Sequence, residues 1–334
     1  MASESKGTVL LALAANAGIA VAKLFAGLLT GSSVMLAEAA HSFADTVNEL
    51  FLLTALRRGD KPPDALHPFG YGKERFFWSL LAAVGIFVAG GAFSIYEGVT
   101  GLLEPPQEAP SYLVSYIVLA IAFVLEGSSL LKALRQTKSE ADQAGRGVVE
   151  QVRRSTDPTV KTVVSEDSAA VVGLVLAATG LALHEITGNA VWDALAAIGV
   201  GLLLIVVAFL LGRDTKEMLI GEAADGPTRL AMHDRLAAHP EVERVIDLLT
   251  MLLGPDRLLV AARVDLADRL SSGEVESFST AMDRELRAEF PMVVSVFLDA
   301  TTAQGDDLVR ADRLSHAMNR LRRDVTTAAP QGAP

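Results

Sequence analysis

Apolar residues in the first two thirds of the chain fall into six long stretches separated by short polar links. The stretches cover residues 8–29, 33–57, 76–103, 112–134, 158–184 and 190–212. Each approaches or exceeds the roughly 20 residues that an α-helix needs to cross the hydrocarbon core of a bilayer. The first is too long for the apolar part of a signal peptide and has no convincing cleavage site, so we expect it to be retained. The pattern predicts a membrane α-helical domain with six transmembrane helices over residues 1–212.

Positive charge alternates between the links. The three links around Gly31, Pro105 to Pro110 and Gly188 contain no Lys or Arg, whereas the other two links are basic. The basic residues are Arg57, Arg58, Lys61, Lys73 and Arg75 in one link, and Lys132, Arg135, Lys138, Arg146, Arg153, Arg154 and Lys161 in the other. By the positive-inside rule these two links face the cytoplasm, so both termini are expected to be cytoplasmic.

After Gly212 the pattern becomes that of a soluble α+β domain. Helical periodicity over 227–238 and 271–290, with cap-like residues from Ser272 to Val275, alternates with strand patterns over 242–252, 256–266 and 292–299. Turn residues between the first two strands, Gly254-Pro255-Asp256, predict a hairpin. The order αββαβ predicts a small three-stranded sheet backed by two helices over residues 213–302. Residues 303–334 are expected to be a flexible tail with at most one short helix, over 306–323.

Two ionisable residues, His41 and Asp45, lie near the middle of the second apolar stretch. A charged side chain in hydrocarbon costs at least about 2.5 kcal/mol, so such residues normally face a helix bundle and mark an ion or proton pathway. His41 and Asp45 are one helical turn apart, so their side chains share a face and could close on a single cation.

Two more acidic residues, Glu166 and Asp167, lie inside the fifth stretch. That helix has a clear start, with Asp157 as its N-cap and Pro158 in its first turn. Glu166 and Asp167 follow about 15 Å further along, and Asp45 lies about 18 Å from the basic end of its own helix, at 1.5 Å per residue. The acidic residues of the two helices therefore lie at similar depth and could share one ion.

The composition excludes several kinds of functional site. The chain is 51% hydrophobic, and it contains no cysteine, which excludes disulfides, thiolate metal sites and cysteine nucleophiles. A net charge of -11 argues against a nucleic-acid partner. Neither a GxxxxGK[ST] phosphate loop nor an HExxH metalloprotease motif occurs, so we expect neither an enzyme nor a bound cofactor.

Three motifs carry a family resemblance: AEAAHSFADTVNE (37–49), HPFGYGKERFFWSLL (67–81) and SEDSAAVVG (165–173). With them, the chain resembles the cation diffusion facilitator family of divalent-metal transporters up to about residue 302. The second and third motifs are similar to the zinc-transporter-9-like branch. The resemblance implies six helices followed by a ferredoxin-like or metallochaperone-like cytoplasmic domain.

The resemblance assigns His41 and Asp45 to one half of the family's transport site. The other half usually has two ligands one turn apart on helix five, but here Ala170 follows Glu166 and Val163 precedes Asp167 by four residues. Since Glu166 and Asp167 point about 100° apart on a helix, we favour Asp167 as the third ligand. Glu166, Asn48 or water would complete the shell.

Other polar residues have alternative interpretations. His67, with Glu74, could form a second metal site, or the His67-Pro68 pair could fix the loop. Lys23 could be a buried ion-pair partner or extend to the interface. Glu126 could pair with Lys23 or line the cytoplasmic path. The histidines of the C-terminal domain are too few to predict a metal cluster there.

The resemblance implies a homodimeric secondary transporter that exports Zn2+ in exchange for protons, with dimer contacts in the cytoplasmic domain. Without transit-peptide features, we expect it in a bacterial-type plasma (inner) membrane, although the related branch also occurs in organelles. Protons would drive release because they compete with the metal for the same ligand lone pairs. Fe2+, Co2+, Ni2+ or Mn2+ are alternative cargoes, and a non-transporting metal sensor or scaffold is an alternative function. The expected partners are the metal ion, membrane lipid and a second copy of the chain.

Overall fold

The computed structural model describes residues 6–103, 112–143, 145, 147–155 and 157–328. The chain divides into two compact units. The helical unit comprises residues 1–61 and 73–216, and the C-terminal unit comprises residues 62–72 and 217–334. The loop 62–72 therefore groups with the C-terminal unit, although the sequence pattern places it among the membrane helices.

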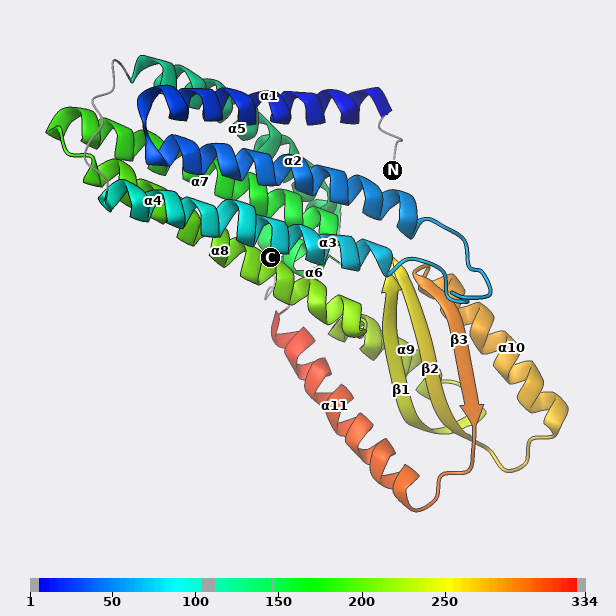
Figure 1. Cartoon of the computed structure of the whole chain (residues 1–334). Coiled ribbons are helices and arrows are strands. Elements are labelled where there is room, and N and C mark those ends of the chain that lie inside the picture. The colour runs from blue at the N-terminus through cyan, green and yellow to red at the C-terminus, as the bar shows by residue number, and fades with distance from the viewer. Residues whose placement is uncertain (1–5, 104–111, 144, 146, 156, 329–334) are drawn as a thin grey trace. The chain divides into compact units, whose positions relative to one another are not determined.

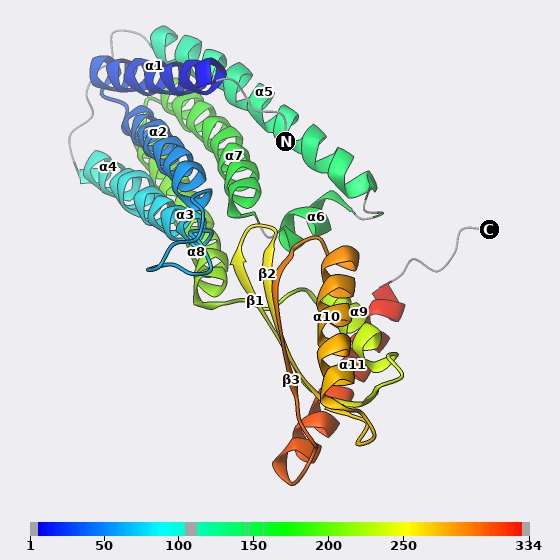
Figure 2. The ribbon, with the colours of Figure 1, turned by 90° about the vertical axis from the view of Figure 1, so that its right-hand side faces the viewer.

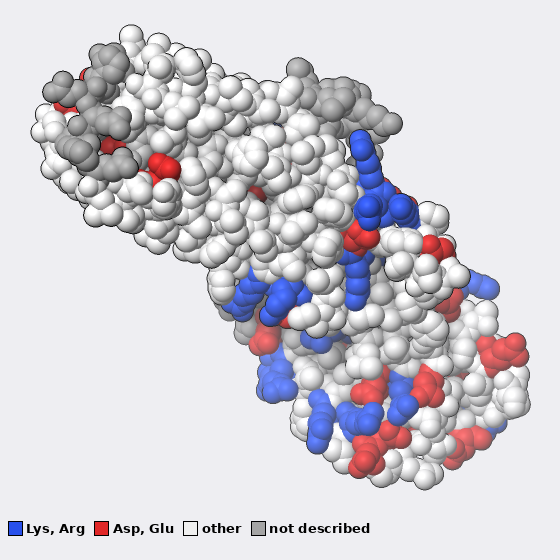
Figure 3. All heavy atoms as spheres, in the orientation of Figure 1, with Lys and Arg blue, Asp and Glu red and all other residues white. Residues whose placement is uncertain are grey.

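Long helices make up the helical unit and run side by side (Figures 1 and 2). They are α1 (Lys6–Thr30), α2 (Ser33–Gly59), α3 (Glu74–Gly85), the π-helix η1 (Ile86–Ala92), α4 (Phe93–Leu103), α5 (Leu113–Gln143), the short α6 (Val148–Arg154), α7 (Pro158–Thr187) and α8 (Val191–Ile220). Among the described residues, four stretches are long and apolar enough to cross a membrane: Glu74–Leu103, Leu113–Gln143, Pro158–Thr187 and Val191–Ile220. In α1, the part Asn16–Thr30 is also apolar. On the face shown in Figure 3, charged side chains are scarce over most of these helices.

Helix starts follow local sequence. The Ser32 side chain accepts a hydrogen bond from the backbone N–H of Met35 and caps α2. Asp157 accepts from the N–H of Thr159 at 2.9 Å, with Pro158 in the first turn of α7, which confirms the predicted start. Such caps satisfy backbone donors that have no partner within the helix.

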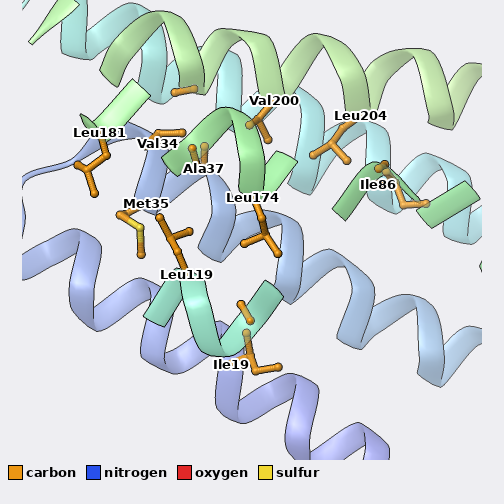
Figure 4. Packing of buried hydrophobic residues seen from close by; sticks show 14 of the residues in the cluster. Ile19, Val34, Met35, Ala37, Ile86, Leu119, Leu174, Leu181, Val200 and Leu204 are labelled. Carbon is orange, nitrogen blue, oxygen red and sulfur yellow. The ribbon is translucent and has the colours of Figure 1, made fainter. Parts of the chain in front are cut away.

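Apolar side chains from several helices meet in one cluster (Figure 4). Met35 of α2, Leu119 of α5 and Leu174 of α7 are almost fully buried within it. Close helix packing also depends on glycines of α4 and α8. A Cβ atom on Gly98 would lie 2.7 Å from the carbonyl oxygen of Ala194, too near for any side chain at position 98. Small residues of this kind allow membrane helices to approach closely.

The C-terminal unit contains a three-stranded sheet and three helices. In chain order they are α9 (Gly226–Ala237), β1 (Val242–Gly254), β2 (Arg257–Leu266), α10 (Ser272–Glu289), β3 (Val293–Ala300) and α11 (Asp306–Ala328). The strand order is β1-β2-β3, with β1 and β2 antiparallel and β2 and β3 parallel. The hairpin turn includes Asp256, one of the predicted turn residues, with a φ of 52°.

Every second residue of β2 is buried, namely Leu258, Val260, Ala262 and Val264. Helices α9 and α10 contact the sheet and bury their own apolar side chains, including Met232 and Met282. Strand alternation at period two thus creates one buried sheet face, as the sequence pattern predicts.

Helix α11 differs from the expectation of a flexible tail over 303–334. Its residues Asp306–Ala328 form a continuous helix that contacts β1 and α9. Ala311 and Met318, seven residues apart, are buried on one face. Arg322 of α11 donates to Asp234 of α9 at 2.6 Å. The helix is stable because it is amphipathic and finds an apolar partner surface. Residues 329–334 lie outside the described part of the chain.

The loop 62–72 contacts the β1–β2 turn within the C-terminal unit. A Cβ atom on Gly72 would lie 2.4 Å from the carbonyl oxygen of Leu253, so only glycine fits there. Arg257 donates to the carbonyl oxygen of Phe69 at 3.4 Å. The loop therefore packs as part of the C-terminal unit.

Candidate metal-binding cavity

A cavity of about 280 Å³ lies between α1, α2, α5 and α7. The polar residues of its lining are Asn16, Ser42, Asp45, Asn48, Glu49, Glu126, Ser129, Glu166 and Asp167. The four helices contact one another in a closed ring, α1 with α2, α2 with α7, α7 with α5, and α5 with α1. Five carboxylates therefore converge on one small space inside an otherwise apolar unit.

His41 and Asp45 lie together, as their spacing predicts. Nδ1 of His41 is 3.5 Å from Oδ1 of Asp45. His41 is 1% exposed, and neither ring nitrogen has a hydrogen-bond partner in the structure. Asp45 lines the cavity, whereas His41 is absent from the described lining. The imidazole is therefore adjacent to the cavity through Asp45, and both of its nitrogens lack a hydrogen-bond partner in the structure.

Glu166 and Asp167 both line the cavity but turn toward different helices. Glu166 is 8% exposed and accepts a hydrogen bond from the amide of Asn48 on α2. Asp167 accepts from the hydroxyl of Ser129 on α5 at 2.8 Å. Sequence reasoning places Asp167 nearest to His41 and Asp45, yet the direct contact with α2 is made by Glu166. The two neighbours are about 100° apart on the helix, and this difference directs them to separate partners.

Sequence reasoning missed Glu49 and Asn16. Glu49 of α2 lines the cavity one turn beyond Asp45, and its Oε1 accepts from Nδ2 of Asn16 on α1 at 2.5 Å. The spacing 41, 45, 49 puts His41, Asp45 and Glu49 on one helix face, and that pattern could have found Glu49. Asn16 could not be found, since nothing in α1 shows which face meets α2.

A buried ion-pair cluster forms beside the cavity. The ammonium group of Lys23 lies 2.9 Å from Glu38, 3.0 Å from Glu126 and 2.8 Å from the hydroxyl of Ser42. Of the alternatives for these residues, the structure confirms pairing of Lys23 with Glu126. Glu126 also lines the cavity, where its Oε2 has no partner. Lys23 thus holds this carboxylate in place.

The described residues contain no group of three or more His, Cys, Asp or Glu close enough to hold one metal ion. The cavity instead presents carboxylates on three different helices, with Asp45 on α2, Glu126 on α5 and Asp167 on α7. Carboxylate, amide and imidazole groups are suitable ligands for divalent cations.

His67, the candidate for a second site, belongs to an exposed cluster in the loop 62–72. Its Nδ1 lies 3.5 Å from Asp64, and its ring stacks on Tyr71 at a centroid distance of 4.2 Å. The Tyr71 hydroxyl and the backbone N–H of His67 donate to Asp64, which holds the pKa of that carboxyl below its usual value. Glu74 lies in the helical unit and accepts from Trp78 at 2.7 Å.

Two histidines of the C-terminal unit, His233 and His239, are each paired with one acidic neighbour. His233 lies 3.1 Å from Asp234, and His239 contacts Glu241. Neither pair belongs to a cluster of three potential metal ligands among the described residues.

Comparison with known proteins decides the family. Residues 9–220 match the cation efflux transmembrane domain, which is most of the helical unit. The chain belongs to the cation diffusion facilitator family. The residues that line the cavity, from Asn16 to Ala170, all lie within the matched range.

Similar proteins place it in the zinc-transporter-9-like branch of this family. The mouse protein named proton-coupled zinc antiporter SLC30A9, mitochondrial, is 32% identical over 327 residues, which cover 97% of this chain and 56% of its own length. Metal tolerance protein C4 of Arabidopsis thaliana is 33% identical over 309 residues, covering 90% of this chain and 66% of its own. The cation-efflux pump FieF of Cronobacter sakazakii is 27% identical over 274 residues, covering 81% and 84%. The chain therefore spans about half the length of the SLC30A9 proteins that it matches, from 44% to 56%.

Proposed function

We propose that this protein is a secondary transporter that moves a divalent transition metal, with Zn2+ as the main cargo, out of the cytoplasm in exchange for protons. The observation that carries the proposal is the cavity, in which five carboxylates converge between four helices of a cation efflux domain. The names of the relatives agree with it: SLC30A9 is named a proton-coupled zinc antiporter, and FieF a cation-efflux pump.

His41 and Asp45 supply one half of the proposed transport site. Glu166 and Asp167 supply the other half, and Asn48 or water completes the shell. An imidazole beside carboxylates suits Zn2+ and also Fe2+, Co2+ or Ni2+, whereas an all-oxygen site favours Mn2+. Ligands must be deprotonated to hold the metal, so protons that enter the cavity displace it. Exchange of one ion for the other follows from this competition.

Alternating access would come from movement of α2 and α7 against their neighbours. In the structure, Asn48 of α2 and Glu166 of α7 are joined by a hydrogen bond at the cavity wall. A metal that binds the free Oε1 of Glu166 would sit on the same carboxylate that joins the two helices, so metal occupancy would act directly on the contact between α2 and α7.

The finer organisation belongs to the same proposal. α1 and α2 complete six membrane spans with α3–η1–α4, α5, α7 and α8. Both termini face the cytoplasm of a plasma (inner) membrane, and two copies associate through the C-terminal unit. His67 remains a candidate for a second metal site in the loop 62–72.

The direct test is metal uptake into proteoliposomes that contain the full chain, with and without a pH gradient. Zn2+, Mn2+, Fe2+, Co2+ and Ni2+ are compared under identical conditions. Zn2+ uptake that rises with an opposing proton gradient supports the proposal. Preferential uptake of another metal would identify that metal as the cargo in place of Zn2+. No uptake of any metal would favour a sensor or scaffold function.

A further inference from the structure

The cavity is longer than one ion requires. Its lining follows α2 from Ser42 to Leu52, which is about 15 Å at 1.5 Å per residue. Asp45, with His41 beside it, occupies the end near Ser42. Toward Leu52 the wall carries Asn48 and Glu49, and α7 contributes Glu166 opposite Asn48. These three residues form a second tier of the cavity, one turn from Asp45.

Each residue of this tier has an oxygen atom with no hydrogen-bond partner. The atoms are Oδ1 of Asn48, Oε2 of Glu49 and Oε1 of Glu166, and all three are inaccessible to solvent. Asn48 is 2% exposed and Glu166 is 8% exposed. Burying a polar atom without a partner costs about 1–3 kcal/mol, so three such atoms beside one cavity point to a ligand that satisfies them.

The other side-chain oxygens of Glu49 and Glu166 already accept hydrogen bonds, and these bonds fix the orientation of the unpartnered oxygens. Asn16 donates to the other carboxylate oxygen of Glu49, and the amide nitrogen of Asn48 donates to the other oxygen of Glu166. Both carboxylates are thereby oriented by amide groups, with one oxygen each left over. All three free atoms are acceptors, so the complementary ligand is a cation rather than an anion.

We propose that Asn48, Glu49 and Glu166 form an all-oxygen cation subsite one turn from the His41–Asp45 pair, and that a cation occupies it in turn with the transport site, because Asn48 and Glu166 belong to both. This inference rests on the proposed transport function, in which the cation passes through the same cavity. Two carboxylates match the charge of one divalent ion. Oxygen ligands without imidazole accept Mn2+ as well as Zn2+, so this tier binds divalent cations broadly and the tier with His41 discriminates among them.

Mn2+ binding to purified full-length protein in detergent tests the subsite, with free Mn2+ measured by its EPR signal. The Asp45→Asn variant impairs the neighbouring tier and is expected to keep one Mn2+ site per chain. Adding Glu49→Gln should weaken that binding by at least about tenfold, since loss of even an outer contact of a metal site costs this much. Adding Glu185→Gln instead should leave it unchanged, because Glu185 accepts from Tyr116 and is not part of the described cavity lining.

The inference is overturned if folded Asp45→Asn protein binds no Mn2+, or if Glu49→Gln leaves its affinity unchanged. Size-exclusion elution and thermal unfolding establish folding, and His41→Gln replaces Asp45→Asn if the latter does not fold. Flux measurements separate this result from the transport proposal. If the wild type transports metal but the Asp45→Asn protein binds no Mn2+, the subsite is refuted and the transport proposal stands. If the wild type transports no metal but Mn2+ binding still depends on Glu49, the transport proposal is refuted and the subsite stands.

Discussion

The ammonium group of Lys23 lies 2.9 Å from the carboxylate of Glu38, and neither side chain is exposed. With Glu126 and Ser42, this pair uses all three N–H donors of Lys23 and joins α1, α2 and α5. Replacing Lys23 by Met should leave two carboxylates uncompensated in a water-poor interior. Loss of one partner of a buried ion pair typically costs about 3–5 kcal/mol, so the thermal unfolding midpoint in detergent should fall strongly.

The double variant Lys23→Met/Glu38→Met provides the control for this prediction. It removes the cation together with one of its two anions, so it should be more stable than Lys23→Met alone. Wild-type stability of Lys23→Met would show that the cluster does not hold the three helices together.

Glycine packing gives a second prediction. A Cβ atom on Gly98 would meet the backbone of Ala194 and Ile198 at 2.7 and 2.9 Å, so Gly98→Ala must push α4 away from α8. Overpacking of this kind costs about 1–3 kcal/mol. Gly127→Ala is the matched change, since nothing lies within 4 Å of its added Cβ, and it should stabilise α5 slightly. Thermal unfolding that ranks the two variants in the opposite order would contradict the close α4–α8 contact.

Helix α11 should stabilise the C-terminal unit. Met318 is 3% exposed, and Met318→Ala should cost about 2–5 kcal/mol, as for other large-to-small changes in a core. Arg313 is an exposed residue of the same helix, so Arg313→Ala should be within about 0.5 kcal/mol of the wild type. Limited proteolysis of the full chain measures both. Equal cleavage rates in the two variants would show that α11 does not pack on the C-terminal unit, and would support the flexible tail that the composition suggests.

The loop 62–72 should respond to pH through Asp64. Because hydrogen bonds from Tyr71 and the backbone of His67 lower its pKa in the folded protein, its contribution to loop structure is present above the pKa of an unfolded aspartate. That contribution is lost as pH falls through the lowered pKa. Tyr71→Phe removes the largest cause, so the Asp64 titration should move to higher pH. A carboxyl ¹³C NMR titration measures it, and an unchanged midpoint in Tyr71→Phe would refute the hydrogen bond's role.

Much of the fold could be predicted because its determinants are local. Helix caps depend on only a few adjacent residues. The structure contains both the N-cap Asp157 and the capping box of Ser271 and Glu274. The strand over 256–266 is likewise predicted from its short apolar run and the turn residues before it. His41 and Asp45 were found because ionisable residues are rare inside apolar helices.

Other features depend on contacts between distant segments. Asn16 becomes a cavity residue only when α1 packs on α2, and Gly72 is constrained only by the hairpin that contains Leu253. Helix α11 is polar enough to resemble a tail until α9 and β1 cover its apolar face. The directions of Glu166 and Asp167 likewise depend on Asn48 and Ser129, which belong to other helices.

Zn2+ uptake driven by a pH gradient in proteoliposomes, compared between Asp45→Asn and Glu185→Gln, tests the central claim most directly. Both changes remove one carboxylate from a membrane helix, but only Asp45 lines the cavity. The account predicts that Asp45→Asn reduces uptake to the rate of empty vesicles, while Glu185→Gln transports like the wild type. Wild-type uptake by correctly folded Asp45→Asn protein would contradict it, because the cation would then cross elsewhere.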